Sequence, residues 1–155
     1  MGKRRSLRAA LAKHARVGVD SSVLIYHLEG LAPYASLTEI VFTDLARGAI
    51  AAVIPTICVT ELLVKPLADR ADDKVRSCEA FLDGLPNTQF VPPTVSIAKE
   101  AARLRAVHRL RTPDALLIAT ALAEKATAFL TNDARMKRVE EEGITVLVLR
   151  DYIAS

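Results

Sequence analysis

The chain has 155 residues, of which 51% are hydrophobic and 25% are charged, and its formal net charge is +3. This length suits one domain with a single core, and this composition excludes an intrinsically disordered chain. The longest uncharged run, residues 84–98, holds 15 residues with three prolines, whereas a membrane-spanning helix needs about 18 or more apolar residues. Because the basic start is not followed by the apolar stretch of a signal peptide, we expect a cytoplasmic protein with no membrane segment.

Basic residues are concentrated at the start of the chain. Six of the 21 Lys and Arg residues lie in residues 1–19, where there is no acidic residue, so that 15 basic and 18 acidic residues remain in the rest. We therefore divide the chain into a basic arm, residues 1–15, and a single domain, residues 16–155. The arm either binds a polyanion or is a frayed, solvated tail.

Short apolar segments alternate with helical patterns along the domain. The apolar segments are predicted strands over residues 16–20, 49–54, 87–91, 126–130 and 144–149. Helices are predicted over residues 21–28, 34–47, 56–67, 69–85, 94–110, 112–125 and 132–142. Ser21 or Ser22 is expected to cap the first helix, and Pro66 to stop or kink the third. This alternation indicates an α/β fold, a doubly wound five-stranded parallel sheet with helices on both faces.

One segment, residues 112–133, combines a helix start with a strand end. Thr112 can cap the helix, Pro113 suits its first turn, and Asp114 faces the positive end of the helix dipole. The strand that follows ends in Thr131-Asn132-Asp133. In a parallel α/β sheet both places lie at the carboxyl edge of the strands, where binding sites form.

Two further acids occupy comparable places. Asp20 directly follows the first predicted strand, and Glu61 lies in an apolar stretch of the helix after the second. Carboxylates about 4 Å apart repel by roughly 4 kcal/mol at an effective dielectric constant of 20, so a cluster of four acids requires protonation or a bound cation. Ligand sets made only of oxygen atoms suit Mg²⁺ or Mn²⁺ rather than zinc.

Each acid also has a purely structural interpretation. Asp20 and Asp133 can cap the helices that follow them. Asp114 can interact with the helix dipole alone, and Glu61 can extend into solvent. Spacing along the chain does not decide between these interpretations and a shared site.

Four short motifs hold these acids: Val19-Asp20-Ser21-Ser22, Thr60-Glu61, Pro113-Asp114-Ala115-Leu116 and Thr131-Asn132-Asp133. In their order and approximate spacing they resemble the successive signatures of PIN-domain nucleases, most of all the VapC toxins of bacterial toxin–antitoxin pairs. The resemblance extends from about Val17 to Ile153. It implies a PIN-like fold and a metal-dependent endoribonuclease that hydrolyses RNA phosphodiester bonds as the toxin of a type II toxin–antitoxin system.

The same resemblance implies roles for individual residues and for partners. It implies that Mg²⁺ or Mn²⁺ is held by four acids, Asp20, Glu61, Asp114 and Asp133. The hydroxyl of Thr131 is expected to hydrogen-bond within the acidic pocket, with Asn132 as a supporting residue. Proteins that look like this usually form homodimers and are inhibited by a VapB-like antitoxin, whose C-terminal segment reaches the active site.

We hypothesise that a water held by the metal attacks the RNA phosphodiester in line. Basic partners for the substrate phosphates are expected in the N-terminal arm and among four arginines that precede Asp114, namely Arg103, Arg105, Arg109 and Arg111. These arginines can equally be the solvated face of a helix. The alternative function is a catalytically silent PIN-like module that binds RNA or a protein.

Overall fold

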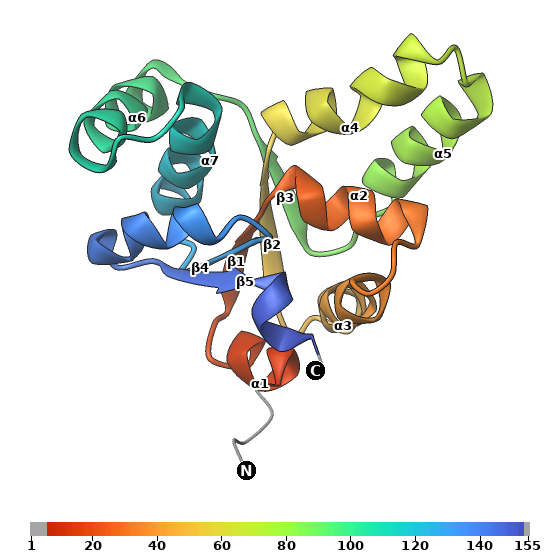
Figure 1. Ribbon diagram of the computed structural model, residues 1–155, viewed down its shortest axis with the longest axis horizontal. Helices are drawn as coiled ribbons and strands as arrows, with labels where there is room; N and C mark the ends of the chain where they lie inside the picture. Colours follow the sequence, from red (N-terminus) through yellow and green to blue (C-terminus); the bar gives the residue numbers. More distant parts are fainter. Residues whose placement is uncertain (1–5, 154–155) are drawn as a thin grey trace.

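The computed structural model describes residues 6–153 and contains a five-stranded sheet in the order β3-β2-β1-β4-β5 (Figure 1). Every neighbouring pair of strands is parallel. The strands are β1 (Arg16–Val19), β2 (Ala51–Pro55), β3 (Thr88–Val91), β4 (Ala128–Thr131) and β5 (Thr145–Val148). The predicted α/β class and all five predicted strands are confirmed.

Helices cover both faces of the sheet. The α-helices that follow β1 are α2 (Ser21–Glu29), α3 (Ala35–Ala46), α4 (Ile57–Ala68), α5 (Asp72–Asp83), α6 (Val95–His108) and α7 (Thr112–Ala123). Two 3₁₀ helices, η1 (Ala134–Glu142) and η2 (Leu149–Tyr152), follow β4 and β5. Helices α6 and α7 lie on one side of the sheet, and α2 to α5 lie on the other (Figure 1). None of the helices described is long and apolar enough to cross a membrane.

The central strands are apolar because both of their faces are covered. All four residues of β4 are buried, and Val17 and Val19 of β1 are at most 1% exposed. Gly18 lies between them at a point of close packing. A Cβ atom there would stand 2.8 Å from Phe129 Cδ2 and 2.9 Å from Ala121 Cβ, so the glycine lets β4 and α7 pack tightly against β1.

Two local expectations for helix ends, a stop at Pro66 and a cap from Ser21 or Ser22, are wrong. Helix α4 continues through Pro66 to Ala68, although the proline has no N–H to donate to the carbonyl of Leu62. Neither Ser21 nor Ser22 caps α2; Asp20 occupies the N-cap position and makes no side-chain capping bond. The carboxylate of Asp20 is thereby left for other contacts.

The described part of the basic arm is not a frayed tail. Leu7–Leu11 form helix α1, whose N-cap Ser6 Oγ accepts a hydrogen bond from Ala9 N at 3.2 Å. Leu7 and Leu11 are 2% and 0% exposed in the core. Arg8 Nε lies 3.4 Å from Asp44 Oδ1, which ties α1 to α3. Residues 1–5, which carry three of the basic side chains, lie outside the described residues.

Candidate active site

The sheet brings Asp20 and Thr131 together at its carboxyl edge. Asp20 follows β1 directly, Thr131 is the last residue of β4, and these two strands are neighbours. Thr131 Oγ1 donates a hydrogen bond to Asp20 Oδ2 at 2.7 Å, and the threonine is fully buried. The expected contact of Thr131 inside the acidic pocket is therefore present, between residues 111 positions apart in the sequence.

Glu61 reaches the same place from α4 through Ser21. Ser21 Oγ lies within hydrogen-bond distance of Glu61 Oε2 and 3.3 Å from Asp20 Oδ1. A serine hydroxyl has a single proton, so it donates to one of these carboxylates at a time. Ser21 is 5% exposed and its role was missed by the sequence reasoning, which treated it only as a helix cap. The signal available was its position directly after Asp20.

Burial raises the pKa of Asp20 above its ordinary value. The negative charge of Glu61 acts in the same direction, and the hydrogen bonds from Thr131 and Ser21 partly oppose it. Burial disfavours the charged form of a carboxyl group, whereas a cation beside it favours that form. A cation beside Asp20 would therefore favour its ionised form.

Asp133 lies next to Thr131, but its carboxylate binds an arginine and not Asp20 or Glu61. Its backbone N–H donates to Thr131 Oγ1 at 3.1 Å. Its side chain caps η1 by accepting from Arg135 N at 3.0 Å, and both carboxylate oxygens bind the Arg135 guanidinium at 2.7 to 3.2 Å. This guanidinium is the main reason that the pKa of Asp133 lies below its ordinary value.

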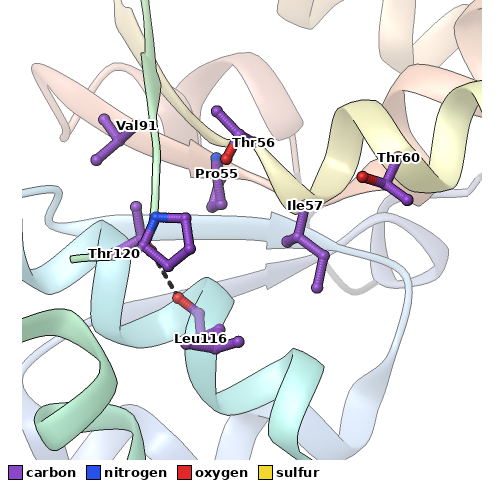
Figure 2. A pocket seen from close by; sticks show the side chains of 8 residues that line it. Pro55, Thr56, Ile57, Thr60, Val91, Leu116 and Thr120 are labelled. Carbon is purple, nitrogen blue, oxygen red and sulfur yellow. Dashed lines mark hydrogen bonds between the residues drawn. The ribbon is translucent and has the colours of Figure 1, made fainter. Parts of the chain in front are cut away.

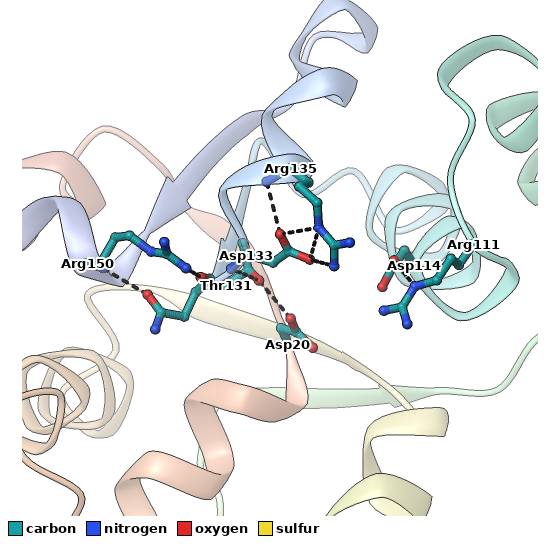
Figure 3. Close-up of polar contacts among 8 residues, drawn as sticks. Asp20, Arg111, Asp114, Thr131, Asp133, Arg135 and Arg150 are labelled. Atoms are coloured by element: carbon teal, nitrogen blue, oxygen red, sulfur yellow. Dashed lines mark hydrogen bonds and ion pairs between the residues drawn. The ribbon is translucent and has the colours of Figure 1, made fainter.

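Asp114 occupies the first turn of α7, as predicted, and also faces an arginine. Arg111 Nε lies 3.2 Å from Asp114 Oδ2. Figure 3 shows Asp114, Asp133 and Asp20 around one space at the sheet edge, with Arg111 and Arg135 beside Asp114 and Asp133. We call Asp20 and Glu61 the inner acid pair, and Asp114 and Asp133 the outer acid pair.

The predicted four-acid site is therefore assembled in part. The structure joins the inner acid pair to Thr131 and Ser21, and it attaches the outer acid pair to arginines. Within residues 6–153, no three acids, cysteines or histidines come close enough together to hold a metal ion. Ligation of a metal by all four acids remains a prediction.

Asn132, the supporting candidate, ties neighbouring elements together at the end of β4. Its Oδ1 accepts from Arg150 N at 3.0 Å, and its Nδ2 donates to the Tyr26 hydroxyl at 3.2 Å. Arg150 Nη2 also donates to the backbone carbonyl of Asn132 at 2.8 Å. These bonds fix the chain between Thr131 and Asp133.

Of the four arginines expected near the substrate, only Arg111 contacts a site acid. Arg103 binds Glu100 and Glu142, both at 2.6 Å. Arg105 Nε donates to Leu110 O at 3.0 Å, and Arg109 ends α6 in the left-handed conformation at φ 55°. Arg103 and Arg105 thus belong to the structure of α6 and its neighbours.

Two pockets lie beside α4, the helix that carries Glu61. One, of about 270 Å³, lies where β2 and β3 end beside α7, and Thr120 Oγ1 donates to Leu116 O within it at 2.7 Å (Figure 2). Its wall includes Thr60, the neighbour of Glu61. The other, of about 630 Å³, lies between α2, α4 and α5, and Glu61 itself lines it.

Comparisons with known proteins agree with this architecture. A chain in a toxin–antitoxin complex from Klebsiella pneumoniae is 18% identical, with a TM-score of 0.65 over 86% of this chain and 97% of that chain. Chains in VapBC2 from Rickettsia felis bound to a promoter DNA fragment and in DNA-bound VapBC from Salmonella typhimurium are 14% and 15% identical, with TM-scores of 0.65 and 0.59. Each covers 86% of this chain and 98% of its own length.

These likenesses show a shared fold. Among curated proteins, none matches the sequence at a significant level. The sequence model of the PIN domain matches residues 17–142, which span β1 through η1 and include all four acids and Thr131. The chain belongs to the PIN domain family.

Proposed function

We propose that this protein is an endoribonuclease that hydrolyses RNA phosphodiester bonds and serves as the toxin of a type II toxin–antitoxin system. The observation that carries this proposal is the contact of Thr131 and Ser21 with Asp20 and Glu61 at the carboxyl edge of a PIN sheet. The toxin role is supported by the likeness of this fold to chains in toxin–antitoxin complexes from Klebsiella pneumoniae, Rickettsia felis and Salmonella typhimurium.

The inner acid pair fits a hard divalent cation, Mg²⁺ or Mn²⁺. Two carboxylates share one serine hydroxyl, and burial favours the protonated form of Asp20 in the absence of a cation. Asp20 and Glu61 would hold the metal, and Asp114 and Asp133 would complete its ligands after leaving their arginines. When bound, such an ion stabilises negative charge on the phosphate and lowers the pKa of a water molecule.

Side chains and backbone groups of the protein hold the acids in position. Thr131 donates to Asp20 Oδ2 and accepts from the backbone of Asp133, so one hydroxyl fixes both acids relative to the end of β4. The carboxylate of Asp20 would be one ligand of the cation, and Glu61 lines the larger pocket. In the hydrolysis, a water oxygen bonds to phosphorus as one P–O ester bond breaks, and the departing ribose oxygen takes up a proton as the water loses one.

We further propose the partners that a toxin of this class requires. A segment of a VapB-like antitoxin would occupy the pocket of about 630 Å³, whose wall combines apolar Ile25, Leu28 and Leu62 with Glu61 of the site. Homodimerisation is proposed from the resemblance to VapC toxins. Because the substrate is RNA, we place the protein in the cytoplasm.

A catalytically silent PIN-like module is the second candidate, favoured by the arginines that cover the outer acid pair. Cleavage of labelled RNA by wild type, Glu61→Gln and the control Glu79→Gln on α5, with Mn²⁺, Mg²⁺ or EDTA, separates the two. We expect wild type and Glu79→Gln to cleave RNA at the same metal-dependent rate, and we expect this rate to fall about a hundredfold in Glu61→Gln. RNA binding without cleavage under either metal would instead support the silent module.

A further inference from the structure

Two arginines cover the outer acid pair from the solvent side. Arg135 binds Asp133 through two nitrogens, and Arg111 binds Asp114 through Nε. The arginine side chains are 64% and 69% exposed, whereas the carboxylate side chains are 29% and 18% exposed. The positive partner in each pair is therefore the more solvated one, and the acid is the more buried one.

The two pairs also influence each other. Arg111 adds to the positive charge near Asp133, and Asp114 adds to the negative charge near Arg135. The outer acid pair and its arginines thus form one cluster with no net charge. The inner acid pair differs, because its contacts in the same region are the hydroxyls of Thr131 and Ser21.

We propose that Arg111 and Arg135 are exchangeable counter-ions: they occupy Asp114 and Asp133 until a divalent cation binds, and they then bind phosphate groups of the RNA. This inference rests on the proposed function. A dication beside the inner acid pair would attract the same carboxylates and repel the guanidinium groups, so the arginines and the metal compete. An arginine replaced in this way stays at the site edge with its side chain free to move.

Phosphate is the chemical group that suits the released arginines. Guanidinium presents paired N–H donors whose geometry matches the oxygens of carboxylates and of phosphates alike. The acidic edge would repel an RNA backbone unless positive groups stood beside it. Arg111 and Arg135 supply two such charges within reach of the acids, whereas Arg103 and Arg105 are held elsewhere.

The first test measures Mn²⁺ binding without RNA, by calorimetry or by the electron paramagnetic resonance signal of free Mn²⁺. Removal of an exposed, screened competitor such as Arg135→Gln or Arg111→Gln should tighten the Mn²⁺ dissociation constant about threefold. The matched control is Arg76→Gln, because Arg76 is 68% exposed and pairs with Asp73 three residues away on α5. Its Mn²⁺ affinity should equal that of wild type. Unchanged or weaker Mn²⁺ binding in both site variants would overturn the inference.

The second test concerns the RNA and uses KM and kcat measured with saturating Mn²⁺. Arg135→Gln should raise the KM for RNA about three- to tenfold, the effect of losing one phosphate contact, and Arg135→Lys should restore part of the loss by keeping the charge. A KM equal to that of wild type in Arg135→Gln and Arg111→Gln would contradict the phosphate role.

The outcomes also separate this inference from the proposed function. Wild-type cleavage with no effect of either arginine on Mn²⁺ affinity or KM would refute the inference and leave the nuclease intact. Tighter Mn²⁺ binding in the arginine variants of a protein that never cuts RNA would support the counter-ion role and refute the nuclease. Absence of Mn²⁺ binding in every variant would overturn both.

Discussion

The Thr131 hydroxyl makes two hydrogen bonds: it donates to the carboxylate of Asp20 and accepts from the backbone N–H of Asp133. Thr131→Val keeps the shape of the side chain and removes both bonds, leaving the carboxylate of Asp20 without its shortest partner. We expect cleavage to fall about ten- to a hundredfold, as for other losses of a positioned hydrogen bond near reacting atoms. Thr131→Ser should keep most of the activity. Equal activity of the valine and serine variants would show that the hydroxyl has no positioning role.

The ionised form of Asp20 lowers the stability of the folded protein by an amount that depends on pH. Its pKa is raised chiefly by burial, so the folded state binds the proton more tightly than the unfolded state and loses stability as the pH rises past the ordinary value of 3.8 and through the raised pKa. Asn cannot ionise. In EDTA, at pH values above the raised pKa of Asp20, the Asp20→Asn variant should melt a few degrees higher than wild type. A change of about 1 kcal/mol in stability corresponds to about 2–4 °C in melting temperature.

Thermal unfolding of both proteins across a pH series in EDTA measures this difference. The difference in melting temperature between the two proteins should disappear as the pH falls below the ordinary pKa range of a carboxyl group. Added Mn²⁺ should stabilise wild type and not Asp20→Asn, since only a native state that binds the ion is stabilised by it. A mutant less stable than wild type at neutral pH in EDTA would contradict the account of Asp20.

At the scale of elements, α1 is held to the domain by two leucines on one face. Leu11 is fully buried, so Leu11→Ala should lower the free energy of unfolding by about 2–4 kcal/mol through lost burial and the cavity left behind. Urea denaturation measures the change, and exposed Lys13→Ala in the same segment is the control. A loss below about 0.5 kcal/mol, the range of ordinary surface changes, would mean that α1 is dispensable for folding.

Glu142, the last residue of the 3₁₀ helix η1, joins this helix to α6. Glu142 binds Arg103 at 2.6 Å and His108 at 2.7 Å, and these hydrogen bonds lower its pKa to about 2. A carboxyl group with a lowered pKa adds stability above its ordinary value of 4.5, and this stability is lost as the pH falls from there toward about 2.

Glu142→Gln removes this contribution. Because the pair is partly solvated and screened, we expect a loss of about 1 kcal/mol at neutral pH. The difference between the two proteins should shrink as the pH falls below about 4.5, measured by urea denaturation at each pH. A loss that is constant across this pH range would assign the effect to packing rather than to the charge of Glu142.

At the scale of the whole molecule, the sequence predicted those features that follow from periodicity and strand order. Apolar runs and helical spacing identified all five strands, and the rule that sites form at the carboxyl edge of a parallel sheet predicted the edge at which Asp20 and Thr131 meet. The packing of α1 was missed because basic residues surround Leu7 and Leu11, and charge dominated the interpretation of that segment.

The side-chain contacts of the acids could not be predicted in the same way. Sequence spacing places a carboxylate at an edge but does not say whether its nearest partner is another acid, a hydroxyl or an arginine. Ser21 and Arg135 lie one and two residues from site acids, yet only the backbone turn after each strand determines that their side chains reach them. The division into inner and outer acid pairs therefore required the structure.

We propose that Asp20 belongs to a metal-dependent RNA-cleaving site. The most direct measurement is the rate of cleavage of labelled RNA by wild type and Asp20→Asn with Mn²⁺ and with Mg²⁺, in preparations purified free of other ribonucleases and shown by circular dichroism to be folded. We predict cleavage by wild type that EDTA abolishes, and a decrease of about a thousandfold or more in Asp20→Asn. A folded Asp20→Asn protein that cuts as fast as wild type, or a wild type that cuts under neither metal, would contradict the claim.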